Sequence, residues 1–413
     1  MTPISQEFAP PFKLIAPFFI LGAFFYLFAS LFIFSFNEGS ISYLQPDVLS
    51  FVHIFLLGFV MMSIFGAMAQ LIPVVLEVGH FSVELFYAIW PLLLVGTLLM
   101  AFGFIALPAL LPYGGVLVLI SMLIFVSEIF LTIKKVKKFT IVMSSVLIAN
   151  SFLFFGVIIG LVIALGYAGS IVVDLSALLK AHLYLVIGGY VSITIMGLSV
   201  ILLPMFGLSH GFSLRPLHQA LYMMSIAVVS VVISSLFHLD YLAYAGYILS
   251  LMALGVYFYQ VYLIYKTRVR KEFDIYAKSL LFAYISLLIA LVLGALSLVI
   301  SYEPLLVSAM YLLFFGFFGF AITGHIYKII PFLVWFERFA PLVGKRKVPM
   351  LADMLPLKSS DAQFVFSSIG VVLVTVALLT QSTQLLNSGA SFLVVGAVAL
   401  VRSVFYMINY KEN

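Results

Sequence analysis

Long apolar segments alternate with short polar segments along the whole of this 413-residue chain. The apolar segments are continuous and mostly reach the roughly 20 residues that a helix needs to cross a bilayer, whereas a transmembrane strand would alternate in character at every residue. We therefore expect an all-α integral membrane protein in contact with the lipid bilayer. The pattern predicts twelve spans, near residues 13–36, 50–76, 83–108, 109–133, 140–168, 177–205, 216–237, 241–265, 276–301, 306–335, 364–381 and 390–409.

The polar segments carry opposite charges on the two sides of the predicted membrane. The loops on one side hold Lys134, Lys135, Lys137, Lys138, Arg215, Lys266, Arg268, Arg270, Lys271, Lys345, Arg346 and Lys347. The loops on the other side hold Glu38, Asp47, Asp174, Asp240 and Glu303, with Lys180 as their only cation. Because basic loops stay in the cytoplasm, we expect both termini inside, in a multi-pass protein of a bacterial-type inner membrane.

The composition narrows the classes of function. Hydrophobic residues make up 65% of the chain and charged residues 8%, against about 25% charged residues in an average soluble domain. The net charge of +5 comes from the basic loops on one side, so it does not indicate a nucleic-acid partner. The chain contains no cysteine, which excludes disulfides, thiolate metal sites and iron–sulfur clusters.

Three of the predicted spans share a pattern of small residues. A glycine, a second glycine eight residues later and a proline seven residues after that occur at Gly58, Gly66 and Pro73, at Gly189, Gly197 and Pro204, and at Gly316, Gly324 and Pro331. On a helix these steps keep the positions within about an 80° sector, and small residues on one stripe let helices approach closely in lipid. We interpret the four-span period as three four-helix units, near residues 1–138, 139–272 and 273–413, of a single membrane domain.

Histidines are the most plausible ligands for a metal, because neutral imidazole commonly binds copper, iron and zinc where thiols are absent. His53, His182 and His238 lie at the outer ends of the second, sixth and seventh spans, the first two at equal depth on repeat-related helices. We interpret His53 and His182 as ligands; the alternative is that each ring only bonds a backbone carbonyl. Further metal candidates lie at the inner ends of spans, with solvated side chains as the alternative: Glu77, His80, His210, His218, His325 and Glu337.

This arrangement resembles subunit I of the haem–copper oxidase superfamily, above all its C-type oxidase and nitric oxide reductase branches and the NnrS-like membrane proteins. Residues 52–59 (VHIFLLGF) and 66–73 (GAMAQLIP) look like the second helix of that family. The resemblance implies that His53 is an axial ligand of a b-type haem. It also implies that His182 and His238 take the places of copper ligands, so that they would hold copper or zinc here.

The chain departs from the family pattern at several positions. The tenth-span position that matches His53 is Tyr311, with Met310 beside it, where the family has histidines. Leu239 follows His238 in place of a second histidine, and Val186 replaces a tyrosine one turn after His182. We therefore expect Met310 or no protein group opposite His53 on a haem, and no complete oxygen-reducing centre.

Two classes of function follow, and a scaffold subunit whose cofactor sites have decayed is a third possibility. The first is a haem- or metal-binding membrane protein in nitric oxide or respiratory metabolism, which would be an oxidoreductase if it is an enzyme, with quinol or another redox partner. The second is a transporter or channel without redox chemistry, in which buried polar groups line a path: Gln70, Glu128, Asn150, Lys328 and Arg402. Glu128 and Arg402 lie in the inner halves of their spans, where they could pair. Apolar outer faces would permit a homo-oligomer, although lipid contact explains them equally well.

Overall fold

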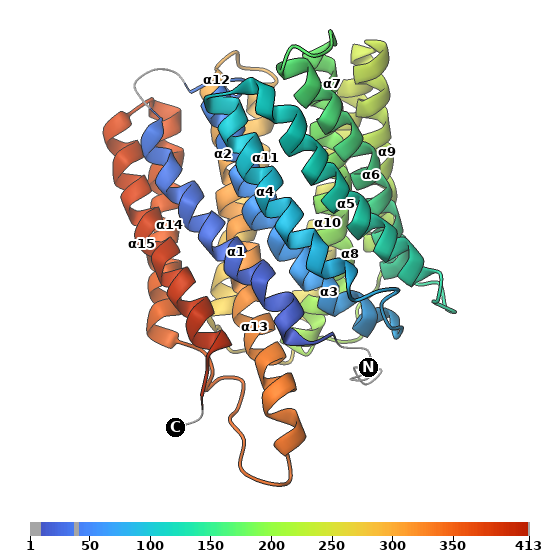
Figure 1. Ribbon diagram of the computed structural model, residues 1–413, viewed down its shortest axis with the longest axis vertical. Coiled ribbons are helices and arrows are strands. Elements are labelled where there is room, and N and C mark those ends of the chain that lie inside the picture. Colours follow the sequence, from blue (N-terminus) through green and yellow to red (C-terminus); the bar gives the residue numbers. More distant parts are fainter. Residues whose placement is uncertain (1–9, 37–40, 412–413) are drawn as a thin grey trace. The chain divides into compact units, whose positions relative to one another are not determined.

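The computed structural model describes residues 10–36 and 41–411 as helices joined by short connections (Figure 1). Glu38 lies outside the described residues. Within them no strand occurs, and Ser209 and Arg268 form an isolated bridge. Twelve helical segments of the described chain are long and apolar enough to cross a membrane: Phe12–Ser35, Pro46–Leu76, Leu85–Ile105, Pro108–Ile133, Ile141–Tyr167, Leu175–Gly207, Arg215–Phe237, Asp240–Lys266, Ile275–Ser297, Glu303–Arg338, Leu357–Thr380 and Thr383–Ile408. The prediction of an all-α, multi-pass membrane protein is confirmed.

Most observed span ends lie within four residues of the predicted ends. The exceptions include the last two spans, which begin seven residues earlier than the apolar runs at residues 364 and 390. Their first turns are polar and partly exposed, and hydrogen bonds hold them in the helix: the Ser359 hydroxyl donates to the Ala399 carbonyl, and Ser382 caps the last helix by accepting from the Leu385 N–H. Hydropathy registers only the apolar part of such a helix.

Nine spans are built around one main α-helix, and three contain a π-helical segment. The former are α1 (Phe12–Phe32), α4 (Leu85–Ile105), α5 (Leu111–Ile133), α6 (Ile141–Tyr167), α9 (Arg215–Phe237), α10 (Asp240–Lys266), α11 (Ile275–Ser297), α14 (Leu357–Thr380) and α15 (Thr383–Ile408). The latter are span two, with α2 (Pro46–His53), η3 (Ile54–Met61) and α3 (Met62–Leu76); span six, with α7 (Leu175–Leu183), η5 (Tyr184–Ser192) and α8 (Ile193–Gly207); and span ten, with α12 (Glu303–Tyr311), η6 (Leu312–Phe318) and α13 (Gly319–Arg338).

The described residues form two compact units. Unit 1 comprises residues 72–99 and 108–272, and unit 2 comprises the described residues 10–36, 41–71, 100–107 and 273–411. The second predicted repeat lies wholly in unit 1 and the third wholly in unit 2, while the first is divided between them. The division into three four-helix units stays a prediction.

The paired glycines of spans two, six and ten lie against the preceding span. A Cβ atom added to either glycine of a pair would come too close to a side chain of the preceding helix. In each pair, the two glycines contact two different side chains, and these side chains are seven positions apart on that helix. These side chains are Phe25 and Phe18 on α1, Phe152 and Ser145 on α6, and Ser286 and Ser279 on α11. The same close helix contact therefore recurs three times, each time within one unit.

The π-helical segments occupy the same place in the three repeats. Each contains the first glycine of its pair, namely Gly58, Gly189 or Gly316. His53 and its repeat equivalent Tyr311 are each the last residue before such a segment. π-Helical turns are rare and frequently occur at functional sites, so these three positions mark the predicted outer halves of spans two, six and ten as unusual.

In unit 2, aromatic rings fill the space between spans one, two and ten. Phe315 of η6 stacks on Phe51 and Phe55 of span two, at centroid distances of 5.6 and 4.3 Å, and on Tyr311 at 5.3 Å. Tyr26 of α1 lies 5.5 Å from the same ring. All five side chains are buried, so this part of unit 2 is a continuous aromatic core.

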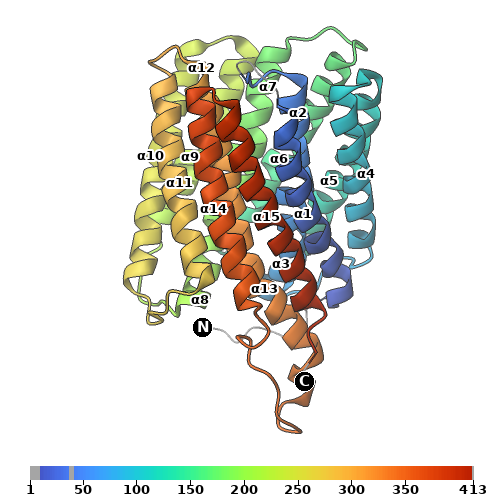
Figure 2. The same ribbon diagram turned by 90° about the vertical axis from the view of Figure 1, so that its left-hand side faces the viewer.

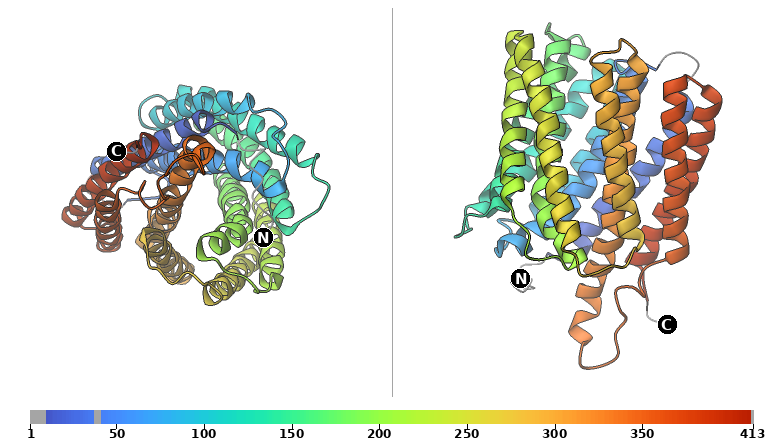
Figure 3. Two further views of the ribbon diagram at one scale, coloured as in Figure 1. Left: turned by 90° about the horizontal axis from the view of Figure 1, so that it is seen from below. Right: turned by 180° about the vertical axis from the view of Figure 1, so that it is seen from behind.

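The C-terminal helices complete unit 2. Figure 2 shows α14 and α15 side by side, with α1 next to α15. After α13, residues 339–356 form a loop that extends beyond the end of α14 (Figure 3). Trp335 ties this loop to its helix, because its indole N–H donates to the Pro349 carbonyl at 2.8 Å. The loop contains the basic residues Lys345, Arg346 and Lys347 that the charge pattern assigns to the inner side.

Candidate functional site

His53 lies at the end of α2 with its ring against the end of α4. Its Nδ1 atom donates to the carbonyl of Leu49, one turn earlier, at 2.7 Å, and its ring lies 4.9 Å from that of Phe104. The side chain is partly buried. Since a carbonyl oxygen only accepts, the proton of a neutral ring is on Nδ1, and Nε2 carries the lone pair with which an imidazole binds a metal.

Met310 faces a different part of unit 2. It lines an apolar pocket together with Phe51, Val52 and Tyr311. The ring of His53 lies against Phe104, and His53 is not among the residues that line this pocket. A haem shared between spans two and ten, which the resemblance implies, does not fit this arrangement, because the stacked rings of Phe51, Phe55 and Phe315 fill the space between these spans.

His182 is held against α6 in unit 1. Its Nδ1 atom donates to the Gly156 carbonyl at 2.8 Å, and a Cβ atom on Gly160 would lie 2.8 Å from its ring. Two glycines one turn apart on α6 thus make room for the ring and expose the carbonyl that it bonds. As at His53, a neutral ring has its proton on Nδ1 and its lone pair on Nε2.

His238 does not join His182. It caps the end of α9 with a positive φ of 55°, and its Nε2 lies 3.9 Å from an Asp174 carboxylate oxygen. Asp174 is the N-cap of α7, eight residues before His182, which corresponds to about 12 Å along a helix. The His238 side chain is 73% exposed. The expected copper or zinc pair is therefore not assembled, because the two histidines lie at different depths of unit 1.

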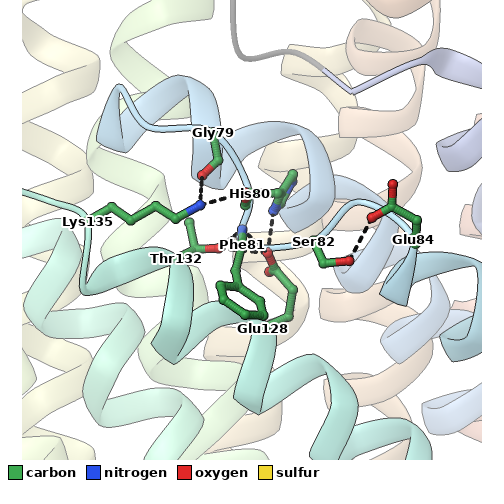
Figure 4. A network of polar contacts seen from close by, with 8 residues as sticks. All are labelled: Gly79, His80, Phe81, Ser82, Glu84, Glu128, Thr132 and Lys135. Atoms are coloured by element: carbon green, nitrogen blue, oxygen red, sulfur yellow. Dashed lines mark hydrogen bonds and ion pairs between the residues drawn. The ribbon is translucent and has the colours of Figure 1, made fainter.

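The inner candidates include one buried pair, shown in Figure 4. His80, in the connection after α3, places Nδ1 2.9 Å from Oε1 of Glu128 on α5, with side-chain exposures of 1% and 0%. The same oxygen accepts hydrogen bonds from the Thr132 hydroxyl at 2.6 Å and the Phe81 N–H at 3.0 Å. Lys135 donates to the carbonyls of Gly79 and His80, at 3.3 and 2.8 Å.

Helix α5 builds this site with a simple spacing. Glu128 and Thr132 lie four positions apart, which places them on one face of α5, and Lys135 follows in the turn after the helix ends at Ile133. The connection after α3 begins at Glu77, which has a positive φ of 54°, and brings the His80 ring edge-on to Phe86 at 4.8 Å. Outside the pair, the Ser82 hydroxyl donates to Glu84 at 2.7 Å and holds the pKa of that exposed carboxyl below its ordinary value.

A second ion pair lies in unit 2 between the start of α11 and the middle of α13, on the side that the charge pattern predicts to be inner. Lys328 on α13 contacts Asp274, the N-cap of α11, at 2.6 Å, with side-chain exposures of 20% and 19%. His325, one turn earlier, donates to the Ala321 carbonyl, and its Nε2 lies 3.4 Å from the Tyr276 hydroxyl. His325 is therefore part of a polar group within unit 2 that includes a lysine cation.

The remaining inner candidates are exposed and dispersed. Glu77, His210, His218 and Glu337 each have an exposed side chain. Glu337 accepts a hydrogen bond from the N–H of Phe12 and so caps the start of α1. Across the part of the chain that the structure describes, no three histidines, aspartates or glutamates lie together as metal ligands would.

Three other polar residues were predicted to line a transport path. Gln70 and Asn150 are buried, and each has an amide oxygen without a hydrogen-bond partner. Arg402 lies on the exposed face of α15. Glu128, which the sequence suggested as a partner for Arg402, instead has its hydrogen bonds from His80, Thr132 and Phe81.

The comparisons leave the resemblance untested. No protein-family model and no curated protein matches this sequence. Sequence reasoning named His80 and Glu128 separately but missed their contact, and it missed Asp274 altogether. The spacing of Glu128, Thr132 and Lys135 at the inner end of a span was the available signal for the first of these sites.

Proposed function

We propose that this protein is a haem- or metal-binding membrane protein of a bacterial-type inner membrane. His53 would be the protein's axial ligand to a b-type haem, and His182 would bind copper or zinc. Met310 lines a pocket to which His53 does not contribute, so His53 would be the one protein ligand that the proposal assigns to the haem. A haem held by His53 would supply a centre that can bind a small molecule such as nitric oxide, and quinol or another redox partner would supply electrons.

The shared geometry of His53 and His182 is the observation that carries this proposal. In both, Nδ1 donates to a backbone carbonyl, of Leu49 or of Gly156. Histidines that bind metals usually donate their other ring N–H to a carbonyl or carboxylate, which fixes the ring and its tautomer. Both residues also lie at the start of a π-helical segment in repeat-related spans: His53 directly precedes η3, and one residue separates His182 from η5. A purely structural histidine needs only the carbonyl bond, so the test must address the cofactor itself.

The test is the composition of the full-length protein purified in mild detergent. Absorption spectra of the oxidised and reduced protein are recorded, and copper and zinc are measured by mass spectrometry. A Soret band with b-type features after reduction is expected, at about one haem per chain. A colourless protein with stoichiometric copper or zinc would retain only the role of His182. A protein with neither chromophore nor metal overturns the proposal.

A second candidate, a transporter or channel, is favoured by ionisable groups inside the spans. Glu128 and Lys328 both lie within span-length helices, where charged side chains are costly and commonly mark pathways for ions or protons. Each has a partner within its own unit, His80 or Asp274. This function would be supported instead if the purified protein contains neither haem nor metal and if liposomes that contain the protein show flux of a solute or ion.

A further inference from the structure

The two oxygens of the Glu128 carboxylate have unequal surroundings. Oε1 accepts from three donors, namely the His80 ring, the Thr132 hydroxyl and the Phe81 N–H. Oε2 is equally buried and has no hydrogen-bond partner among the described residues. Buried polar atoms in proteins almost always have a partner, and an unpartnered carboxylate oxygen in an apolar surrounding is costly.

No nearby cation donates a hydrogen bond to Oε2 among the described residues. Lys135 is the ammonium group of the network, but its hydrogen bonds go to the backbone carbonyls of Gly79 and His80 (Figure 4). The other ionisable groups on the adjoining segments are Glu77, Glu84, Lys134, Lys137 and Lys138. All of these are exposed, and α3 and α4 carry no charged residue.

A divalent metal ion is a poor fit for the same position. Among the described residues, no third histidine, aspartate or glutamate joins His80 and Glu128 as a metal ligand would, and structural metal sites in proteins commonly use four ligands. The His80 Nδ1 atom is also already directed at the carboxylate, as a donor. A proton, in contrast, needs no set of several ligands. When it binds Oε2, the carboxylate becomes a neutral carboxylic acid, and burial no longer leaves a charged oxygen without a donor.

We propose that His80 and Glu128 form a proton-binding site at the inner ends of spans two and four. With a neutral imidazole and an ionised carboxylate the pair has a charge of −1. Uptake of one proton from the inner aqueous phase onto Glu128 Oε2 makes the pair neutral overall, as a carboxylic acid beside a neutral imidazole. Release of the same proton restores the charge of −1.

The location of the pair suits proton exchange with the inner side. Glu128 lies five residues before the end of α5, which is about 7.5 Å along the helix. His80 belongs to the short connection after α3, next to the exposed residues Glu77 and Glu84. The pair is thus covered by protein but only one or two helical turns from the end of its span. This site does not depend on whether the protein binds haem.

Infrared difference spectroscopy of the full chain in detergent, recorded between about pH 5 and pH 9, tests the proposal. A protonated carboxyl in an apolar site gives a carbonyl stretching band separate from that of a carboxylate. We expect one such band to grow as the pH falls, to shift in heavy water, and to be absent from Glu128→Gln. The matched control is Glu84→Gln, which removes an exposed carboxyl from the same site region and should leave the band unchanged.

A milder variant keeps the test decisive if Glu128→Gln does not fold. Thr132→Val removes one donor to the carboxylate but leaves its charge. Because a hydrogen bond to a charged group favours the ionised form, the midpoint of the band's titration should move to higher pH by about one unit. The absence of any pH-dependent carboxyl band in the wild-type protein, or a band that persists in Glu128→Gln or does not move in Thr132→Val, overturns the proposal. Haem content is read from the visible spectrum of the same samples, so the two proposals fail separately.

Discussion

Gly189 in η5 lies so close to Phe152 of α6 that a Cβ atom on the glycine would stand 2.7 Å from the Phe152 Cβ. Real Cβ atoms do not approach other atoms so closely, so a larger residue at this position requires one of the two helices to move. The contact recurs at Gly58 with Phe25 and at Gly316 with Ser286. It explains physically why the repeat pattern begins with glycine.

Gly189→Ala should destabilise unit 1 by about 1–3 kcal/mol, the usual cost of overpacking a buried contact. Thermal unfolding of the detergent-solubilised protein, followed by fluorescence-detected size exclusion, measures the change. Gly255→Ala is the matched control, since no atom lies within 4 Å of a Cβ atom there and alanine favours a helix. Equal melting temperatures for the two variants would contradict the close contact.

His53→Ala should abolish the haem signal of the purified protein, because the proposal gives the haem no other protein ligand. His218→Ala is the control: His218 also donates from Nδ1 to a carbonyl one turn earlier, that of Leu214, but its side chain is exposed near the start of α9. Reduced-minus-oxidised spectra at matched protein concentration provide the measurement. A Soret band that survives in His53→Ala removes this residue from the haem site.

The Lys328–Asp274 pair should contribute more to stability than an exposed pair. Removing either partner leaves a partly buried charge, so Lys328→Met or Asp274→Asn should each cost about 2 kcal/mol, less than for a fully buried pair because both side chains are about one-fifth exposed. The double variant should recover part of this loss. The same cycle on Lys278 and Asp361, whose side chains are 39% and 54% exposed, should give a coupling below about 1 kcal/mol. Comparable couplings for the two pairs would refute the expected difference.

The orientation predicted from the basic loops can be read with single cysteines, because the chain has none of its own. A cysteine at Lys137 should be protected from a membrane-impermeant maleimide in intact cells and react after permeabilisation. A cysteine at Val172, an exposed position between α6 and α7, should react in intact cells. The opposite labelling pattern would reverse the assignment of inner and outer sides.

The predicted metal ligands show where sequence reasoning stopped. His53 and Met310 were matched by their depth on spans two and ten, but depth does not fix the direction of a side chain. The ring of His53 turns to Phe104, while Met310 lines a pocket with Val52. Likewise, His182 and His238 belong to consecutive spans, yet His238 lies beside Asp174 at the start of α7.

The sequence by itself determined the helical class, the twelve spans and the glycine positions that recur in spans two, six and ten. These features follow from the length of apolar runs and from local spacing, which a bilayer and a 3.6-residue helix translate directly into structure. Tertiary structure alone decided that His80 meets Glu128 and that aromatic rings occupy the space between spans two and ten. Such contacts depend on the rotation of each helix and on the path of its connections. His80 and Glu128 are 48 positions apart, so no local sequence pattern predicts that they are in contact.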